Sequence, residues 1–440
     1  VVRLKELLNK HNYSDAIIFG HALEGNLHFV FSQDFNIESE VQRYKSLMDD
    51  VSNLVVNEFD GSLKAEHGTG RNMAPFVEYE WGEQAYAIMK EIKNIFDPEN
   101  ILNPGVILNE DESIHLKNLK ELPAADEIID KCTECGFCES RCVSEGLTLS
   151  PRQRISTFRE MKRLQKSGDG RTYEKLFSLF KYSGDETCAT DGLCSTNCPI
   201  GIDTGSAIKK LRSKNRNCFS RFIAKRIAHN FSVASVGIRI LLETVHWLSS
   251  RFGERNFNKI SGVLTNISGN IIPHWNKYLP RGNSKIHQQQ SLKTNSPKVV
   301  YFPSCINRMM GTSTDYKDET ALTEKTVSLL RKAGYEIIYP SNLNKLCCGM
   351  SFNSKGFYEE GQYKLNELLN ELIVISENGT MPILFDMSPC YHRTKSELKS
   401  LLKIYEPVEF ILTFLKDKLV FNKTDKVISI YSTCSSQQEG

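Results

Sequence analysis

The sequence has almost no net charge and no unbroken apolar segment. Its 440 residues include 55 lysines and arginines and 53 aspartates and glutamates, a net charge of +2. So balanced a charge gives no general reason to expect a nucleic acid partner. No apolar run reaches the roughly 18 residues that span a bilayer, and no signal peptide opens the chain. The sequence therefore predicts a protein that is not integral to a membrane.

An initiator methionine is also missing, since the chain opens on Val1 and stops at Gly440, shortly after Cys434. We expect a piece of a longer protein. With 40% hydrophobic residues, a chain of this length can form about three domains.

Against these absences stand 13 cysteines, seven of which fall in two runs. The first run is spaced C-x2-C-x2-C-x3-C and the second C-x5-C-x3-C-P: Cys132, Cys135, Cys138 and Cys142, then Cys188, Cys194 and Cys198. Three thiolates two residues apart in a tight loop can face one [4Fe-4S] cube. Zinc sites pair distant C-x2-C units instead, and disulfides need an oxidising compartment. The runs therefore predict iron-sulfur clusters and electron transfer.

We expect the two runs to share their clusters. The fourth cysteine of such a run usually binds the other cluster, so Cys198 joins the first three cysteines of the first run. The second site receives Cys142 with the remaining two cysteines of the second run, and Asp191 stands where one more cysteine would fall. This predicts either a [3Fe-4S] cluster or a [4Fe-4S] cluster with an Asp191 ligand. The runs resemble the iron-sulfur subunits of succinate dehydrogenase and fumarate reductase, which favours three irons.

Two N-terminal segments carry further candidate site residues. Residues 16–20 and 27–31 are β-rich around a polar loop, which predicts a hairpin with His21 and His28 at the mouths of the loop. Both imidazoles can bind one divalent ion, although two histidines alone are more often ordinary loop residues. Glu66 and His67, in a Gly-rich segment, offer a third ligand and a general base.

A helix is predicted over residues 78–96, ending at Asp97-Pro98. Its apolar stripe has helical spacing, and we assign the stripe to the protein core: Trp81, Ala85, Ile88, Met89, Ile92 and Ile95.

Four motifs in order give the N-terminal region a family resemblance. They read Gly20-His21-Ala22-Leu23-Glu24-Gly25-Asn26-Leu27-His28, Glu66-His67-Gly68-Thr69-Gly70, Phe96-Asp97-Pro98 and Leu102-Asn103-Pro104-Gly105. The region resembles the C-terminal domain of FAD-linked 2-hydroxyacid dehydrogenases of the vanillyl-alcohol oxidase superfamily. The resemblance implies that His21, His28 and Glu66 hold a divalent metal, Zn or Mn, which binds the substrate's carboxylate and hydroxyl oxygens. It also implies that His67 takes the hydroxyl proton while hydride passes to FAD, and that Asn103 contacts the cofactor. The family's phosphate-binding FAD domain would precede this region, so weak flavin retention is expected.

The middle of the chain is basic and then apolar. No acidic residue occurs between Asp203 and Glu243, a stretch with nine lysines and arginines, and residues 231–247 carry few charges. A basic segment that leads into an amphipathic helix suits peripheral contact with an anionic membrane surface. A solvated basic helix followed by a core helix, or a docking face for another part of the protein, is the alternative.

Strands and helices alternate after a glutamine-rich linker at residues 287–296. Strands are predicted at 299–302, 336–339, 383–386 and 427–431, and helices at 320–333 and 357–375. Five cysteines follow these strands or their loops: Cys305, Cys347, Cys348, Cys390 and Cys434. Because ligands of parallel sheets bind beyond the carboxyl ends of the strands, the cysteines predict a further redox or cofactor site.

This region also has a family resemblance. Cys347-Cys348-Gly349 with Ser388-Pro389-Cys390 resembles the cysteine-rich CCG domain of heterodisulfide reductases and of iron-sulfur lactate and glycerol-3-phosphate dehydrogenase subunits. The resemblance implies a further cluster at Cys305, Cys347, Cys348 and Cys390. Arg393 stands where the fullest motif has another cysteine, and Cys434 resembles the opening of a second copy.

Together these features predict a multidomain α+β and α/β architecture. We assign residues 1–110 to a partial FAD-linked oxidase C-terminal domain, 126–215 to a helical two-cluster ferredoxin domain, 216–286 to a basic helical connector and 296–440 to a partial CCG domain. This order resembles the large bacterial FAD and iron-sulfur D-lactate dehydrogenases.

The resemblance implies oxidation of a D-2-hydroxy acid, D-lactate first, with electrons passing through the clusters to a quinone or cytochrome. It places the protein in the cytoplasm or on the inner face of the cytoplasmic membrane. A D-2-hydroxyglutarate or glycolate dehydrogenase, and a non-catalytic iron-sulfur electron carrier, are the alternatives.

Overall fold

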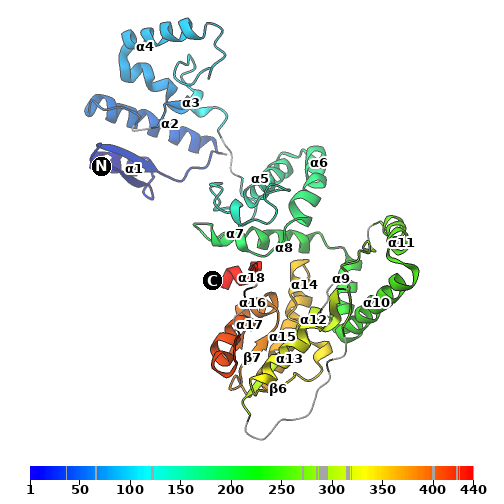
Figure 1. Ribbon diagram of the computed structural model, residues 1–440. Helices are drawn as coiled ribbons and strands as arrows, with labels where there is room; N and C mark the ends of the chain where they lie inside the picture. The colour runs from blue at the N-terminus through cyan, green and yellow to red at the C-terminus, as the bar shows by residue number, and fades with distance from the viewer. Residues whose placement is uncertain are drawn as a thin grey trace. The chain divides into compact units, whose positions relative to one another are not determined.

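A computed structural model describes residues 1–35, 37–64, 67–119, 123–269, 272–283, 286, 296–313, 318, 320–398, 402–422, 425 and 427–439. The chain forms two compact units, drawn in Figure 1. Unit 1 comprises Val1–Ala125 and Phe158–Gly170, and unit 2 comprises Asp126–Thr157 and Arg171–Gly440.

Unit 1 contains a β-hairpin and several helices. Its elements are α1 (Val2–Lys10), β1 (Ile17–His21), β2 (Asn26–Val30), α2 (Glu38–Asn53), α3 (Gly70–Met73) and α4 (Val77–Phe96). The strands pair antiparallel with Phe19 opposite His28, so the predicted hairpin is present. Leu8, Tyr13 and Leu47 form the centre of an apolar core between α1, α2 and the hairpin. This core fixes the strand that carries His28.

The prediction that the apolar stripe of α4 is core was wrong. Trp81, Ile88 and Ile95 expose 50%, 57% and 74% of their surface, and the buried residues of the helix are Val77 and Tyr86. Helical periodicity identifies an apolar face, but it does not say what covers that face. In the part of unit 1 that the structure describes, the stripe stays open.

The short helix η3 (Ile114–Leu116), which comes after α4 in the chain, carries His115 into a small aromatic cluster. The buried ring of His115 lies 5.3 Å from the ring of Phe76 and 6.4 Å from that of Tyr44, measured between centroids. Burial lowers the pKa of His115, because the charged imidazolium loses its hydration there.

Unit 2 begins with helices around the cysteine runs. These are α5 (Pro151–Ser167), which continues into unit 1, α6 (Gly170–Phe180), α7 (Leu193–Thr196) and α8 (Thr204–Lys214). Three longer helices follow as α9 (Cys218–His229), α10 (Phe231–Phe252) and α11 (Glu254–Ile267). Residues 126–215 and 216–286 therefore both contain helices, as predicted.

The C-terminal part is a parallel α/β sheet in the order β6-β4-β7-β8. The strands are β4 (Lys298–Phe302), β6 (Glu336–Ile338), β7 (Ile383–Phe385) and β8 (Ile404–Tyr405). The helices around the sheet are α12 (Cys305–Met309), α13 (Leu322–Lys332), α14 (Met350–Ser354), α15 (Tyr358–Ile375), α16 (Ser388–Glu397) and α17 (Pro407–Phe410). A short antiparallel pair joins β3 (Pro280–Gly282) to β5 (Met310–Ser313). Neighbouring residues of β4 enter cores on opposite faces of the sheet, as buried strands require.

The strand predicted at 427–431 is absent. Val427, Ile428 and Ile430 are exposed, and this run joins no sheet among the described residues. Its β-branched composition favours a strand, but a strand forms only where a neighbour takes its hydrogen bonds. The chain instead ends in helix α18 (Cys434–Glu439).

Helix α10 revises the expectation drawn from the sequence about membranes. With 22 residues and a mean hydropathy of 1.3, it is long and apolar enough to cross a bilayer by length and composition alone. A search for an unbroken apolar run missed it because Arg239, Glu243 and Arg251 interrupt the run. The core helix of a soluble protein passes the same test, yet only 17% of the apolar window is buried here.

We expect acid to destabilise unit 1 through His115. A lowered native pKa means that folding favours the neutral ring. Its stabilising contribution is therefore present above the ordinary histidine pKa of about 6.5 and is lost as the pH falls toward the lower native value. The thermal midpoint of unit 1 should fall below about pH 6.5, and His115→Phe, which cannot be protonated, should show a smaller fall. Thermal unfolding followed by circular dichroism across this pH range measures both. Equal acid sensitivity of the two proteins would contradict the role of His115.

Candidate active site and cluster sites

Three histidines of unit 1 lie close together. The ring centroids of His21 and His28 are 5.9 Å apart, and those of His28 and His67 are 5.5 Å apart. The three side chains come from the end of β1, from β2 and from the loop before α3. Imidazoles that share one tetrahedral ion have centroids about 5 Å apart, given metal–nitrogen distances of about 2.1 Å. The 5.9 Å between the rings of His21 and His28 is only slightly wider, so these two imidazoles can share one divalent ion, with the ring of His67 beside them.

Close contact between the two strands positions two of these rings. A Cβ atom on Gly20 would lie 2.0 Å from the backbone oxygen of Asn26, so only glycine lets the strands approach here. The Asn26 side-chain oxygen accepts a 2.9 Å hydrogen bond from the His21 backbone N–H. The ring of Phe19 stacks on that of His28, with centroids 5.3 Å apart. The hairpin therefore holds both imidazoles before any ligand binds.

Glu66, the predicted third metal ligand, lies outside the described residues. Among the residues that are described, no group of three or more His, Cys, Asp or Glu is arranged to hold a single metal ion. The structure thus brings together the two predicted histidine ligands and the predicted base, His67. The assignment of Glu66 stays a prediction.

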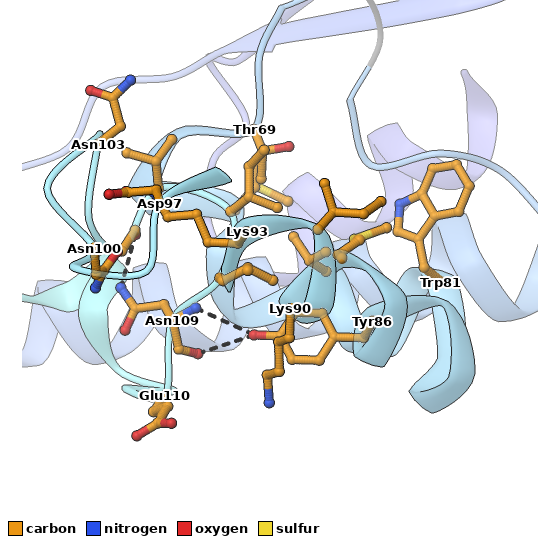
Figure 2. Close-up of a pocket in the computed structure, with 18 of the residues that line it drawn as sticks. Thr69, Trp81, Tyr86, Lys90, Lys93, Asp97, Asn100, Asn103, Asn109 and Glu110 are labelled. Carbon is orange, nitrogen blue, oxygen red and sulfur yellow. Dashed lines mark hydrogen bonds and ion pairs between the residues drawn. The ribbon is translucent and has the colours of Figure 1, made fainter. Parts of the chain in front are cut away.

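A cavity of about 990 Å³ opens along α4 (Figure 2). Trp81 and Ile92 from the exposed α4 stripe line it, together with Asn103, the predicted cofactor contact. Asp97 holds the Asn103 loop, since it accepts 2.9 Å hydrogen bonds from the backbone N–H groups of Ile101 and Leu102. An apolar wall with a few polar groups is typical of sites for organic cofactors. The stripe that we assigned to the core thus lines this cavity, together with the predicted cofactor contact.

The thiols of the two cysteine runs approach one another across the runs. The thiol of Cys138 interacts electrostatically with those of Cys132 and Cys198, and the thiol of Cys188 interacts with that of Cys142. Burial, the largest effect, raises the pKa of Cys138 to about 11. Each iron of a cube takes one thiolate, so the ligands of a cluster lie further apart than those of a single ion. The neighbours found are those that the cross-over assignment pairs, and the ligand set itself stays a prediction.

Sequence reasoning missed a buried arginine beside the predicted site of the second cluster. Arg154 on α5 is almost fully buried, and its guanidinium donates to Cys142 Sγ at 3.6 Å and to the Gly184 carbonyl at 2.7 Å. Its charge also acts to lower the pKa of Cys188, although burial outweighs it. Its position as the fourth residue of a helix after the first cysteine run was only a weak indication that it contacts a cysteine.

Asp191 contacts the C-terminal helix. Its carboxylate accepts a 3.1 Å hydrogen bond from the Leu193 backbone N–H, and its backbone carbonyl accepts one from the side chain of Gln438. Burial, followed by a hydrogen bond with Asp191, raises the pKa of the Cys434 thiol to about 11. The residue predicted to complete the second cluster therefore lies within reach of one more thiol.

The other four cysteines of the C-terminal sheet converge in pairs. The Sγ atoms of Cys347 and Cys305 are 3.9 Å apart, and those of Cys348 and Cys390 are 3.3 Å apart. A Cβ atom on Gly349 would lie 2.1 Å from the Gly361 carbonyl oxygen, so the turn after the cysteine pair requires glycine.

These four cysteines lie beside a buried positive charge. The guanidinium of Arg308 is buried and lies near three of the thiols. Its charge acts to lower the pKa of Cys305, although the neighbouring Cys347 thiol and burial outweigh it and raise that pKa. Arg393, in the place of a fifth cysteine, donates to Gln362 at 3.3 Å and pairs with Glu397. Four thiols beside a buried cation fit the predicted cluster, with Arg393 engaged elsewhere.

Comparison with known proteins agrees with the order of these sites. Residues 1–107 match the model of the FAD linked oxidases, C-terminal domain, and residues 118–202 match that of the 4Fe-4S dicluster domain. No solved structure matches the chain.

Several curated proteins are similar over part of the chain. The glycolate oxidase subunit GlcD of Bacillus subtilis is 36% identical over 93 residues, which are 21% of this chain and 20% of that protein. The D-2-hydroxyglutarate dehydrogenase of Haemophilus influenzae is 26% identical over 291 residues, 53% of this chain and 28% of that protein. The D-lactate dehydrogenase of Anaerostipes hadrus is 35% identical over 89 residues, 20% of this chain and 19% of that protein.

These matches span well under half the length of each relative. They nevertheless agree with the two domain matches and with the imidazole and thiol groups described above. The chain therefore carries an FAD-linked oxidase C-terminal domain followed by a 4Fe-4S dicluster domain, as expected of a protein like the FAD and iron-sulfur D-lactate dehydrogenases.

Proposed function

We propose that this chain takes part in the oxidation of a D-2-hydroxy acid, D-lactate first, to the 2-oxo acid. The observation that carries the proposal is the cluster of His21, His28 and His67 in an FAD-linked oxidase domain. A protein that only carried electrons would have no need of a metal and a base beside each other. The imidazole cluster therefore argues against the non-catalytic alternative.

The chain's own residues would divide the work between binding and proton transfer. His21 and His28, with Glu66, would hold Zn or Mn. Such an ion, when bound, would hold the hydroxyl and carboxylate oxygens and make the hydroxyl more acidic. His67, in its neutral form, would accept the hydroxyl proton. FAD supplies the acceptor for the Cα hydride, and Asn103 would contact it.

Electrons would then leave through the cysteine sites of unit 2. Each hydroxy acid releases two electrons, and the cysteines of the two runs would hold clusters able to accept and release them one at a time. We propose that the second cluster is [3Fe-4S] or an Asp191-ligated [4Fe-4S], and that the CCG cysteines hold a further cluster. A quinone that takes both electrons and two protons, or two cytochrome molecules that take one electron each, would complete the balance at the inner face of the cytoplasmic membrane.

D-2-hydroxyglutarate is the second candidate substrate. The match to the Haemophilus influenzae protein covers 53% of the chain, so it must extend beyond residues 1–107. A series of 2-hydroxy acids, assayed with FAD and a dye acceptor on the full-length natural protein, separates the candidates. Equal lack of turnover with all of them would overturn the proposed function.

Single histidine variants separate metal binding from proton transfer. His21→Ala should lose the bound Zn or Mn in elemental analysis, because it removes a ligand. His67→Ala should keep the metal and lower kcat by about 100- to 10,000-fold, the usual contribution of a general base. His11→Ala, a histidine of unit 1 that pairs with Asp50 instead, is the control and should keep both properties. Normal D-lactate turnover by His67→Ala would refute the assigned base.

Arg154 should set the potential of the second cluster. Reduction adds negative charge to a cluster, so a guanidinium 3.6 Å from Cys142 stabilises the reduced state. Arg154→Gln should lower the midpoint potential by on the order of 100 mV, the Coulomb energy of one charge a few ångströms away in a protein. An EPR-monitored redox titration measures the shift, and Arg154→Lys should restore part of it.

The control for Arg154 lies on the same helix. Arg163 pairs with Glu160 on the surface at 2.8 Å, so Arg163→Gln should leave the potential unchanged. A shift of the same size in both variants would show that the local charge of Arg154 does not act on the cluster.

A further inference from the structure

Helices α9 and α11 each carry a stripe of large apolar side chains that faces solvent. On α11 the stripe occupies positions i, i+3, i+4 and i+7, and on α9 it occupies positions i, i+3, i+4 and i+8. Helix α10, between them, exposes further large side chains. We call these residues the apolar ridge, and each is at least 40% exposed: Phe219, Phe222, Ile223, Ile227, Ile240, Leu241, Trp247, Ile260, Val263, Leu264 and Ile267.

The opposite sides of α9 and α10 are packed, so the exposed stripes do not result from loose helices. Ala224 and Ala228 of α9 are buried with Phe231, Phe352 and Cys347 in one apolar cluster. Helix α10 packs along β3, where a Cβ atom on Gly282 would lie 2.5 Å from the backbone oxygen of Arg239. Figure 1 shows α9 beside the C-terminal domain, with α10 and α11 following it. The parts of the ridge on α9 and α10 are thus held in place by their packed opposite sides.

Basic side chains accompany the ridge. Residues 218–267 contain seven lysines and arginines and two glutamates, in a chain whose net charge is only +2. The Arg226 guanidinium lies 5.1 Å from the centre of the Phe222 ring, so a positive charge lies beside an exposed apolar side chain. Long basic side chains of this kind bury their stems in apolar material and keep their charge at the aqueous interface. Apolar anchors with basic neighbours complement the headgroups and acyl chains of an anionic bilayer.

We propose that the apolar ridge binds the surface of an anionic phospholipid bilayer and lies within its interface. Crossing the bilayer is disfavoured, because Arg239 and Glu243 sit at the middle of α10 and the helix packs on the domain. The ridge supplies the membrane partner of the function proposed above, but its binding to lipid does not depend on that function. One face of α9 contacts Cys347 while the other carries ridge residues, so lipid would lie about one helix diameter, roughly 10 Å, from that cysteine. A lipid-dissolved quinone would then be separated from Cys347 by the width of this helix.

Co-sedimentation of the chain with phosphatidylcholine vesicles, with and without phosphatidylglycerol, tests the proposal. The chain should pellet with the anionic vesicles, and added salt should weaken the binding because it screens the basic residues. Leu264→Asp and Phe222→Asp should each lower the vesicle affinity at least about tenfold, because each places a charge in the apolar interface. Val374→Asp is the matched control, since Val374 is 77% exposed on α15, outside the ridge. It should bind like the unchanged chain.

Three results would overturn the proposal. One is an unchanged chain that stays in solution with anionic vesicles. Another is binding that Leu264→Asp leaves intact. The third is a self-associated chain that ignores vesicles and that Leu264→Asp makes monomeric, since a second copy would then cover the ridge. Lipid binding needs no turnover, so a protein that binds vesicles and oxidises no hydroxy acid would refute only the function proposed above.

Discussion

The buried guanidinium of Arg212 joins the parts of unit 2 that carry the cysteines. It donates to the Asp185 carboxylate at 2.6 Å, to the Cys188 carbonyl at 3.0 Å and to the Ser354 carbonyl at 2.6 Å. These acceptors lie before the second cluster run, within it and at the end of α14, the helix after the CCG cysteines. A buried charge is stable only when it is paired and hydrogen-bonded, so losing any partner would strain both sites. The loop of the second cluster and the CCG loop are therefore positioned by one side chain.

Local patterns in the sequence predicted those elements of the fold that short segments of the chain determine by themselves. The hairpin of His21 and His28 follows from two β-rich runs, and β4 and β7 follow from short apolar runs. Spacing predicted that Cys132 and Cys138 would be neighbours, because loops of two residues between thiols leave few geometries. The run at 427–431 shows the limit of this reasoning, since its strand-like composition has no pairing partner among the described residues.

Contacts between distant segments could not be predicted in the same way. Arg154 lies 12 residues from Cys142, and nothing in its neighbourhood marks it as buried. The contact between Asp191 and Cys434 joins positions more than 200 residues apart. The stripe on α4 has the same period as a core stripe, and only the folded chain shows that it lines a cavity. Periodicity and spacing identify apolar faces and candidate ligands within one segment. Burial depends on which distant segments pack against that segment.

The two units divide the chemistry by residue type. All 13 cysteines lie beyond Ala125 in unit 2, while the imidazole cluster lies in unit 1. Imidazoles move protons and bind metals, but an imidazole does not accept a hydride or store single electrons. Iron-sulfur clusters accept single electrons and cannot take a hydride. A flavin can take a hydride and release electrons singly, so the two units can act on one substrate only through such a cofactor. The division of residues therefore suits a flavin in the proposed reaction, in agreement with the FAD-linked oxidase domain at residues 1–107.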